Sequence, residues 1–97
     1  MDYNIIFLER AENDLDEVLS YRAKFYTGTA NRFMDKLETV MNKIAENPYV
    51  YQRHIHDDTY RRAVVMDYLL FYRICDDSHT VKIYRVLHGK RDIKECL

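Results

Sequence analysis

The chain has 97 residues, of which 47% are hydrophobic and 32% are charged, with only two glycines and one proline. This composition excludes disordered, collagen-like and low-complexity proteins, and we expect residues 1–97 to form a single domain around one core. The formal net charge of −1 argues against nucleic-acid binding by bulk charge, because such proteins usually have a pI above about 9.

The first half of the chain carries the signals of one strand and one helix. Residues 3–8 form an apolar run that predicts a β-strand, buried on both faces or packed under helices. Apolar side chains then recur every three or four residues from Leu8 to Phe25, which predicts an amphipathic helix. Residues 27–29 break this pattern, and we expect Gly28 to adopt a left-handed conformation and Thr29 to cap the next helix.

A second apolar stripe, from Ala30 to Ile44, predicts a second helix. It should end at Asn47-Pro48, because proline disfavours helical geometry in the residue before it and has no amide hydrogen. Since the connection between the two stripes is short, we predict an antiparallel helical hairpin.

After a polar segment at residues 49–59, three runs rich in β-branched and aromatic residues predict strands at 60–66, 68–75 and 80–88. Their short polar connections predict an antiparallel meander. Alternation in the last strand predicts one face with Val81, Ile83, Arg85 and Leu87 and another with Lys82, Tyr84, Val86 and His88. We expect the helices to cover the apolar face and to leave the opposite face to solvent or a partner. The fold class is α+β, an α-helical hairpin on one face of a small antiparallel sheet in the order β-α-α-β-β-β.

Charge is distributed unevenly along the chain, with −3 up to residue 48 and +2 after it. The basic excess near the C-terminal end predicts an anion-binding surface there. The candidate side chains, which suit a phosphate or a partner carboxylate, are Arg61, Arg62, Arg85, His88, Lys90 and Arg91. For any single one of them, an ordinary solvated charge is an equally good interpretation.

Other sites have little support in the sequence. The residues His54, His56, Cys75 and Cys96 lack the spacing of a structural zinc site, so we expect no metal and no cofactor. Two cysteines are too few for a secreted disulfide framework, and no apolar run approaches the roughly 20 residues that cross a membrane. We therefore expect a cytoplasmic protein without a membrane partner. Nine tyrosines raise the possibility of base stacking, but packing in a half-buried core explains most of them better.

Several segments, taken in this order of elements, carry a family resemblance over nearly the whole chain. They are residues 11–15 with Tyr21, Ala30 with Phe33, Asn47-Pro48, and residues 60–62, 68–74 and 81–92. Together they resemble the RelE/ParE superfamily of toxins from bacterial type II toxin–antitoxin systems. The closing Arg-Val-Leu-His-Gly-Lys-Arg-Asp of residues 85–92 most resembles the ParE branch, the plasmid stabilisation proteins.

The resemblance implies a growth-inhibiting toxin that a cognate antitoxin neutralises by folding onto it, forming an oligomer. ParE-like members poison DNA gyrase and are not hydrolases, whereas RelE-like members are metal-independent endoribonucleases that cut mRNA on the ribosome. In the ribonuclease alternative, Arg91 and Arg62 match catalytic positions, and His88 would serve as the acid or the base, because an imidazole can take up or release a proton near neutrality.

Two departures from the ribonuclease pattern favour action on gyrase. Leu69 stands where those enzymes have a phosphate-binding arginine, and Cys96-Leu97 replaces the tyrosine expected near the C-terminus. An inactive module that keeps only the antitoxin contact is a third interpretation.

Overall fold

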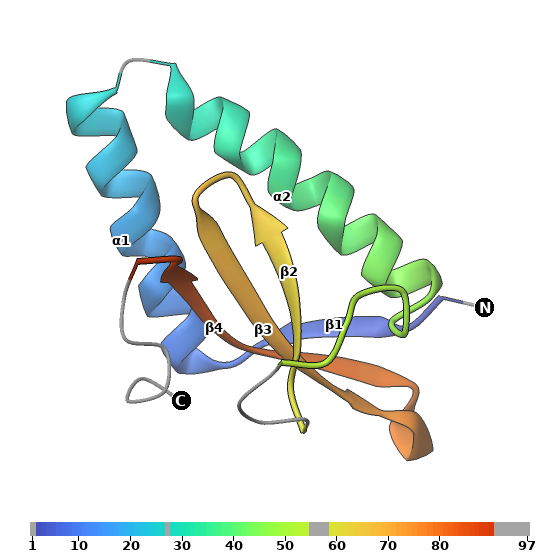
Figure 1. The fold of residues 1–97 in the computed structure, drawn as a ribbon. Coiled ribbons are helices and arrows are strands. Elements are labelled where there is room, and N and C mark those ends of the chain that lie inside the picture. Colours follow the sequence, from blue (N-terminus) through green and yellow to red (C-terminus); the bar gives the residue numbers. More distant parts are fainter. Residues whose placement is uncertain (1, 27, 55–58, 91–97) are drawn as a thin grey trace.

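A strand, two helices and three further strands follow one another along the chain in the computed structural model, which describes residues 2–26, 28–54 and 59–90 (Figure 1). This order confirms the predicted α+β fold. The elements are β1 (Asn4–Phe7), α1 (Glu9–Phe25), α2 (Thr29–Glu46), β2 (Arg61–Val65), β3 (Tyr68–Cys75), a 3₁₀ turn η1 (Asp76–Ser78) and β4 (Thr80–His88).

The four strands form one mixed sheet in the order β1-β4-β3-β2. Strands β2, β3 and β4 are the predicted antiparallel meander, but β1 pairs with β4 in parallel, so the sheet as a whole is not antiparallel. Of the two alternatives for the first strand, burial on both faces is wrong, because β1 lies at an edge of the sheet and Ile6 is 48% exposed. Packing under the helices is confirmed, because Ile5 and Phe7 pack against the main core and α2 contacts β1.

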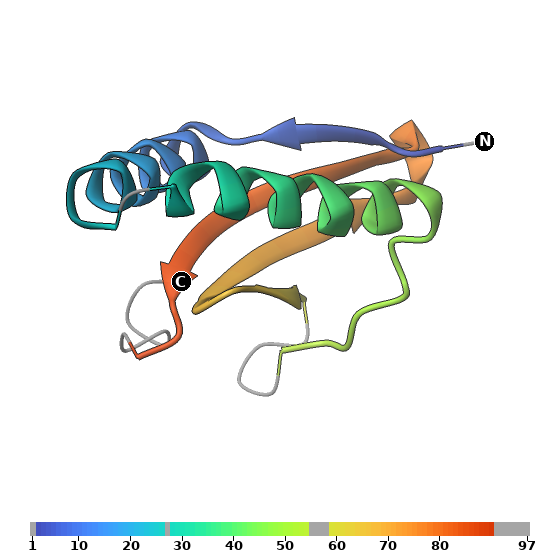
Figure 2. The same ribbon diagram turned by 90° about the horizontal axis from the view of Figure 1, so that it is seen from above.

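Both helices lie on the same side of the curled sheet (Figure 2). They run in opposite directions at an open angle, with α1 against β4 and α2 against β2 and β1 (Figure 1). The main core fills the space between these two layers, and Phe33, Leu37, Ile44, Leu70, Tyr72 and Ile83 are all buried in it. Neither helix in the described part of the chain combines the length and the apolar character needed to cross a membrane.

The ends of α2 depend on glycine and proline. Gly28 occupies the N-cap position with φ +81°, the left-handed conformation predicted for it. The prediction that Thr29 caps α2 is wrong. Thr29 is the first residue of the helix, and its hydroxyl donates a hydrogen bond to the carbonyl oxygen of Tyr26 at 2.7 Å. The helix ends at Glu46, before Asn47-Pro48 as predicted, and the Pro48 carbonyl accepts a buried hydrogen bond from the Tyr72 hydroxyl at 2.7 Å.

A β-bulge in β4 changes which side chains face the helices. Phe71 pairs with Arg85 and Tyr72 pairs with Ile83, so Tyr84 is an extra residue in β4. An extra residue reverses the alternation beyond it. Val86 therefore packs in the main core and Leu87 on the opposite face, and the predicted alternation holds through Tyr84 but is wrong after it.

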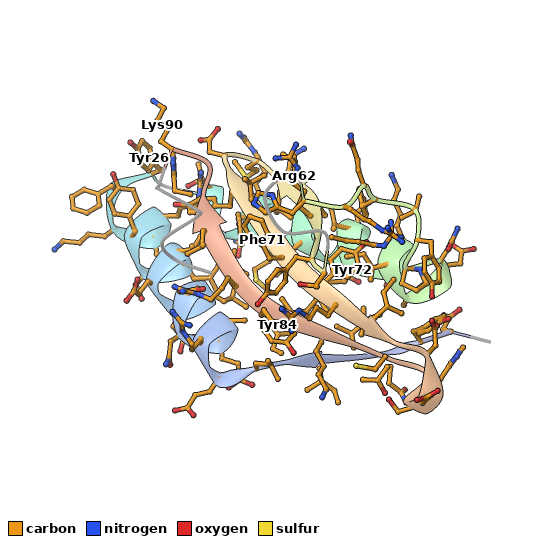
Figure 3. The ribbon with its side chains drawn as sticks, turned by 60° about the horizontal axis from the view of Figure 1, so that its bottom comes forward. Tyr26, Arg62, Phe71, Tyr72, Tyr84 and Lys90 are labelled. Carbon is orange, nitrogen blue, oxygen red and sulfur yellow. The ribbon has the colours of Figure 1, made fainter. Side chains whose placement is uncertain are left out.

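The sheet face away from the helices, here called the outer face, carries a second apolar cluster (Figure 3). Phe71 is 0% exposed and Leu87 is 1% exposed, and Leu69 and Tyr84 pack against them. His54 lies edge-on to the Phe71 ring at 5.1 Å, and Tyr60 belongs to the cluster. The expectation of a bare face is therefore wrong at its centre, where residues that precede β2 cover the sheet.

Candidate functional site

The two adjacent arginines of β2 lie on opposite faces of the sheet. Arg61 pairs with Tyr72 and shares the side of the helices, whereas Arg62 pairs with Phe71 and belongs to the outer face. The Arg61 guanidinium donates to the Tyr51 carbonyl at 2.7 Å and lies 5.0 Å from the centre of the Tyr49 ring. Arg61 is thus directed toward the segment that follows α2.

Arg85 is held in an ion pair with Asp14 of α1. Its Nε donates to Oδ2 of Asp14 at 2.7 Å and its Nη2 donates to Oδ1 at 3.0 Å, with side chains 11% and 9% exposed. The same carboxylate accepts the backbone N–H of Val86 at 3.0 Å. Because β1 ends at Phe7, opposite Ile83, Asp14 supplies the acceptor that a neighbouring strand would otherwise provide for β4. The structure therefore places Arg85 apart from the other candidate residues.

His88 and Lys90 lie at the other end of the β2–β3 hairpin from Arg61. His88 on β4 pairs with Tyr68, which lies four residues, or about 13 Å along β3, from Tyr72, the partner of Arg61 on β2. The backbone N–H of Lys90 donates to His88 Nδ1 at 3.1 Å, which assigns the proton of the neutral ring to Nε2. Arg91 lies outside the described residues.

The metal-ligand candidates are similarly separated. His54 is buried on the outer face and Cys75 is half-buried at the end of β3, while His56 and Cys96 lie outside the described residues. Among the residues that the structure describes, no group of three or more His, Cys, Asp or Glu side chains is placed to hold a metal ion.

Three arginines instead meet in a hollow of about 170 Å³ at the edge of the sheet, where β2 begins. We call it the basic hollow, and it is lined by Tyr49, Arg53, Thr59, Arg61, Arg73 and Ile74. Arg73 donates to the Thr59 hydroxyl at 3.0 Å, and its guanidinium lies 4.1 Å from the centre of the Tyr60 ring and 4.9 Å from that of Tyr84. Among the described residues that line the hollow none is acidic, and three arginines suit it to an anion.

The basic hollow continues onto the outer face, where Arg62, Arg73 and Lys82 come from three adjacent strands. None of β2, β3 and β4 contains an acidic residue. The titratable hydroxyl in the hollow is that of Tyr49, and its hydrogen bond to Asp76 raises the pKa of Tyr49 above its ordinary value. This region can bind phosphate groups or an acidic protein surface, and Tyr49 stays protonated at neutral pH.

Sequence reasoning missed Arg53 and Arg73. The polar segment at residues 49–59 gives no signal for Arg53. The position of Arg73 could have been predicted, because it stands two residues after Phe71 in β3 and side chains two residues apart in a strand lie on the same face of the sheet.

Comparison with known proteins places the chain among toxins. The family model of the ParE toxin of the type II toxin–antitoxin system parDE matches residues 5–93. The fold is similar to that in the chromosomal ParDE system from P. aeruginosa, with a TM-score of 0.73 and 11% identity over 89% of this chain and 95% of that one. No curated protein matches the chain.

Two RelBE toxin–antitoxin complexes share the fold as well. That of E. coli has a TM-score of 0.65 and 17% identity, covering 92% of this chain and 99% of that one. RelBE2 from Mycobacterium tuberculosis has a TM-score of 0.60 and 24% identity, covering 91% and 99%. At these identities the likeness concerns the fold.

Proposed function

This chain belongs to the ParE toxin family of type II toxin–antitoxin systems, and we propose that it inhibits growth by acting on DNA gyrase when its antitoxin is absent. The ParE family match over residues 5–93 carries this proposal. We further propose that residues 1–97 act as one domain in the cytoplasm.

The chemistry of the basic hollow supports action by binding rather than by hydrolysis. RNA cleavage without a metal needs a base for the 2′-hydroxyl and an acid for the leaving oxygen, both next to the phosphate. Tyr49 is a poor base at neutral pH because its pKa is raised. His88 and Arg61 lie on different strands, and their partners on β3 are already about 13 Å apart along that strand, so His88 is far from the basic hollow. Leu69, at the position where the ribonucleases have a phosphate-binding arginine, supplies no positive charge on the outer face.

An antitoxin is the partner that we propose for the exposed apolar side chains. The ParDE and RelBE structures that share this fold are toxin–antitoxin systems by their titles. In this chain Phe25 at the end of α1 and Val64 on the edge strand β2 are more than half exposed. A partner segment that folds on binding would bury both and would form the toxin–antitoxin oligomer.

One observation favours mRNA cleavage on the ribosome as a second candidate function. Three arginines around a small hollow can hold a phosphate of an RNA backbone. In that case Arg62 on the outer face, with His88 and Arg91, would take the catalytic roles. An inactive antitoxin-binding module is the third candidate.

Expression of the chain without an antitoxin separates these functions. We expect double-strand DNA breaks, an induced SOS response and, with purified gyrase and plasmid, accumulation of cleaved DNA. Fragmented transcripts with intact DNA would overturn the gyrase proposal in favour of the ribonuclease. Normal growth at full expression would point to the inactive module.

Charge variants connect the assay to the proposed site. The double substitution Arg53→Gln/Arg73→Gln removes two charges from the basic hollow, and we expect gyrase-dependent DNA cleavage to fall at least tenfold. Arg32→Gln is the matched control, because Arg32 is exposed on α2 in the helical layer. Equal activity of both variants would exclude the basic hollow from target binding.

A further inference from the structure

Two adjoining pockets form a groove between α1 and the end of the meander. They have volumes of about 410 and 250 Å³ and share Tyr21, Tyr68 and His88. We call the combined feature the α1 groove, and its helical wall consists of Asp14, Glu17, Val18, Tyr21, Arg22 and Tyr26. The first five lie on α1 and Tyr26 directly follows it; the 12 steps from Asp14 to Tyr26 correspond to about 18 Å at the helical rise, which is the length of about five extended residues.

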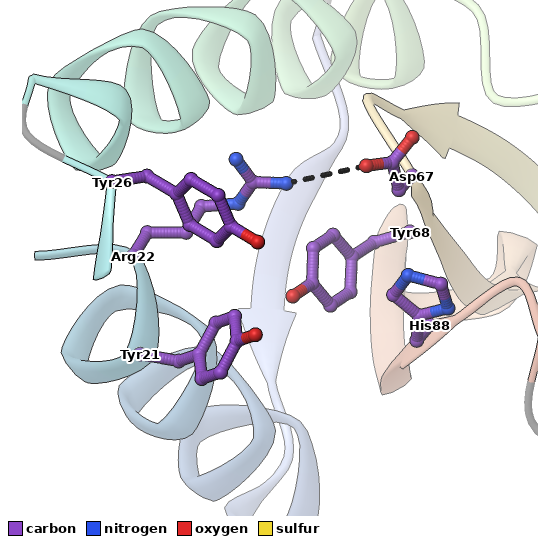
Figure 4. A pocket seen from close by; sticks show the side chains of 6 residues that line it. All are labelled: Tyr21, Arg22, Tyr26, Asp67, Tyr68 and His88. Carbon is purple, nitrogen blue, oxygen red and sulfur yellow. Dashed lines mark ion pairs between the residues drawn. The ribbon is translucent and has the colours of Figure 1, made fainter. Parts of the chain in front are cut away.

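Arg22 lies at the α2 end of the α1 groove with too few partners for a buried cation. Its side chain is 10% exposed and its ion pair with the 71% exposed Asp67 is 3.6 Å long (Figure 4). Within the described part of the chain its Nε has no hydrogen-bond partner, although the guanidinium lies 5.4 Å from the centre of the Tyr68 ring. A buried guanidinium needs acceptors for several N–H groups, so this one favours an additional anion.

Hydrogen-bond donors surround the same space. Figure 4 shows the side chains of Tyr21, Tyr26 and Tyr68 pointing toward one another beside Arg22, with His88 next to Tyr68. A hydrogen bond with Tyr26 raises the pKa of Tyr21, so the Tyr21 hydroxyl stays protonated at neutral pH. Apart from Asp67, each of the described residues at this end can donate a hydrogen bond to an anion.

The β2–β3 turn holds Asp67 beside this site. Met66 has φ +55°, a left-handed conformation that is unfavourable for a residue other than glycine. The carbonyl of Asp67 accepts the backbone N–H of Gly89 at 2.9 Å, which ties the turn to the end of β4. Such local strain often accompanies binding sites.

We propose that the α1 groove binds an extended peptide segment through a carboxylate that lies between Arg22 and the hydroxyls of Tyr21, Tyr26 and Tyr68. The inference rests on the proposed function in taking the antitoxin as the source of this segment. A single carboxylate fits better than a doubly charged phosphate, because Asp67 and Glu17 also line the groove. Asp14 already pairs with Arg85, so Glu17, which is exposed, is the groove carboxylate left for a cation of the ligand. Glu17 lies five to nine residues along the chain from Arg22 and Tyr26, or about 8–14 Å at the helical rise, so we expect a basic ligand residue about two to four positions from the carboxylate.

Nuclear magnetic resonance with a small probe tests the anion site itself. Benzoate should shift the Nε–H signal of Arg22 and bind at least tenfold more tightly than benzamide, its neutral analogue. The double substitution Tyr21→Phe/Tyr26→Phe removes two hydroxyls from half-exposed rings and should weaken benzoate binding at least fivefold without unfolding the protein. Tyr84→Phe on the outer face is the control. Equal binding of benzoate and benzamide, or an unmoved Arg22 signal, would overturn the site.

Peptides test the source of the carboxylate. Two pentapeptides with blocked ends are compared, one with Lys first and Glu last and one with the reverse order. We expect one of them to bind at least tenfold more tightly than the same peptide with Glu→Gln, and more tightly than benzoate. If only benzoate binds, the peptide proposal is wrong. If the antitoxin binds the parent and the Tyr21→Phe/Tyr26→Phe variant equally, the inference fails while the proposed function stands. If no antitoxin is captured but the peptide and benzoate bind, the proposed function fails instead.

Discussion

Replacement of Asp14 by alanine should destabilise the fold strongly, because it leaves the Arg85 guanidinium buried without its carboxylate. Arg85 and the Val86 N–H together make three hydrogen bonds to Asp14. Loss of one partner of a buried ion pair costs about 3–5 kcal/mol. A domain of this length has a total free energy of unfolding of about 5–15 kcal/mol, so the loss is a large fraction of it.

Urea unfolding followed by far-ultraviolet circular dichroism measures this change, since the chain has no tryptophan to report by fluorescence. At a denaturant slope of about 1–3 kcal/mol per molar, the midpoint of Asp14→Ala should fall by at least about 1 M. Asp16→Ala is the control on the exposed side of α1, and it should change stability by no more than about 0.5 kcal/mol.

The double substitution Asp14→Leu/Arg85→Met separates a buried charge from lost packing. It removes both charges, so it should recover most of the stability lost in Asp14→Ala, apart from the hydrogen bond of the Val86 N–H. The reasoning would be refuted if Asp14→Ala and Asp16→Ala unfolded at the same urea concentration, because the pair would then behave as a solvated one.

Three further predictions concern the turn, the outer face and pH. Gly28→Ala should cost about 1 kcal/mol and Gly28→Asn less, because φ is +81° and asparagine tolerates this region; thermal unfolding should show a loss of about 4–8 °C for alanine. Phe71→Ala should lower the free energy of unfolding by about 3–5 kcal/mol in urea, and a loss below about 1 kcal/mol would mean that the outer-face cluster is not a packed core. A hydrogen bond to Asp76 raises the pKa of Tyr3 to about 12, so the contribution of Tyr3 to folding stability should be complete below pH 10 and should disappear as the pH approaches 12. Hydrogen bonds from Tyr49 and Tyr3 lower the pKa of Asp76, so the contribution of Asp76 should be complete above pH 3.8 and should be lost as the pH falls below that value. Stability measured against pH should therefore fall less steeply at both extremes in Tyr3→Phe than in the parent.

The elements of this fold could be predicted because each has a strong local pattern. The helical stripes ending at Gly28 and Pro48 gave both helices, and the β-branched runs gave three strands. The parallel pairing of β1 with β4 has no local signal, because it joins residues that are more than 70 positions apart. The bulge at Tyr84 depends on the register between two strands, which the alternation within one strand does not reveal.

The candidate site was harder to predict for the same reason. Arg53, Arg61 and Arg73 come from three segments that the sheet brings together, and their spacing along the chain shows no pattern. Arg85 looked like a surface cation because its partner, Asp14, is 71 residues away. Local patterns thus identify basic residues, but only the tertiary fold determines which of them remain available to a ligand.

Because the first strand pairs with the last one, the sheet can be completed only after β4 has been synthesised. β1 has β4 as its partner, and β3 also needs β4 on one side, so a nascent chain that stops before residue 80 cannot complete the sheet. Until then the hairpin of helices has only a two-stranded ribbon to cover, and such a ribbon is marginally stable by itself. The toxin therefore reaches its folded form only after the ribosome has translated β4.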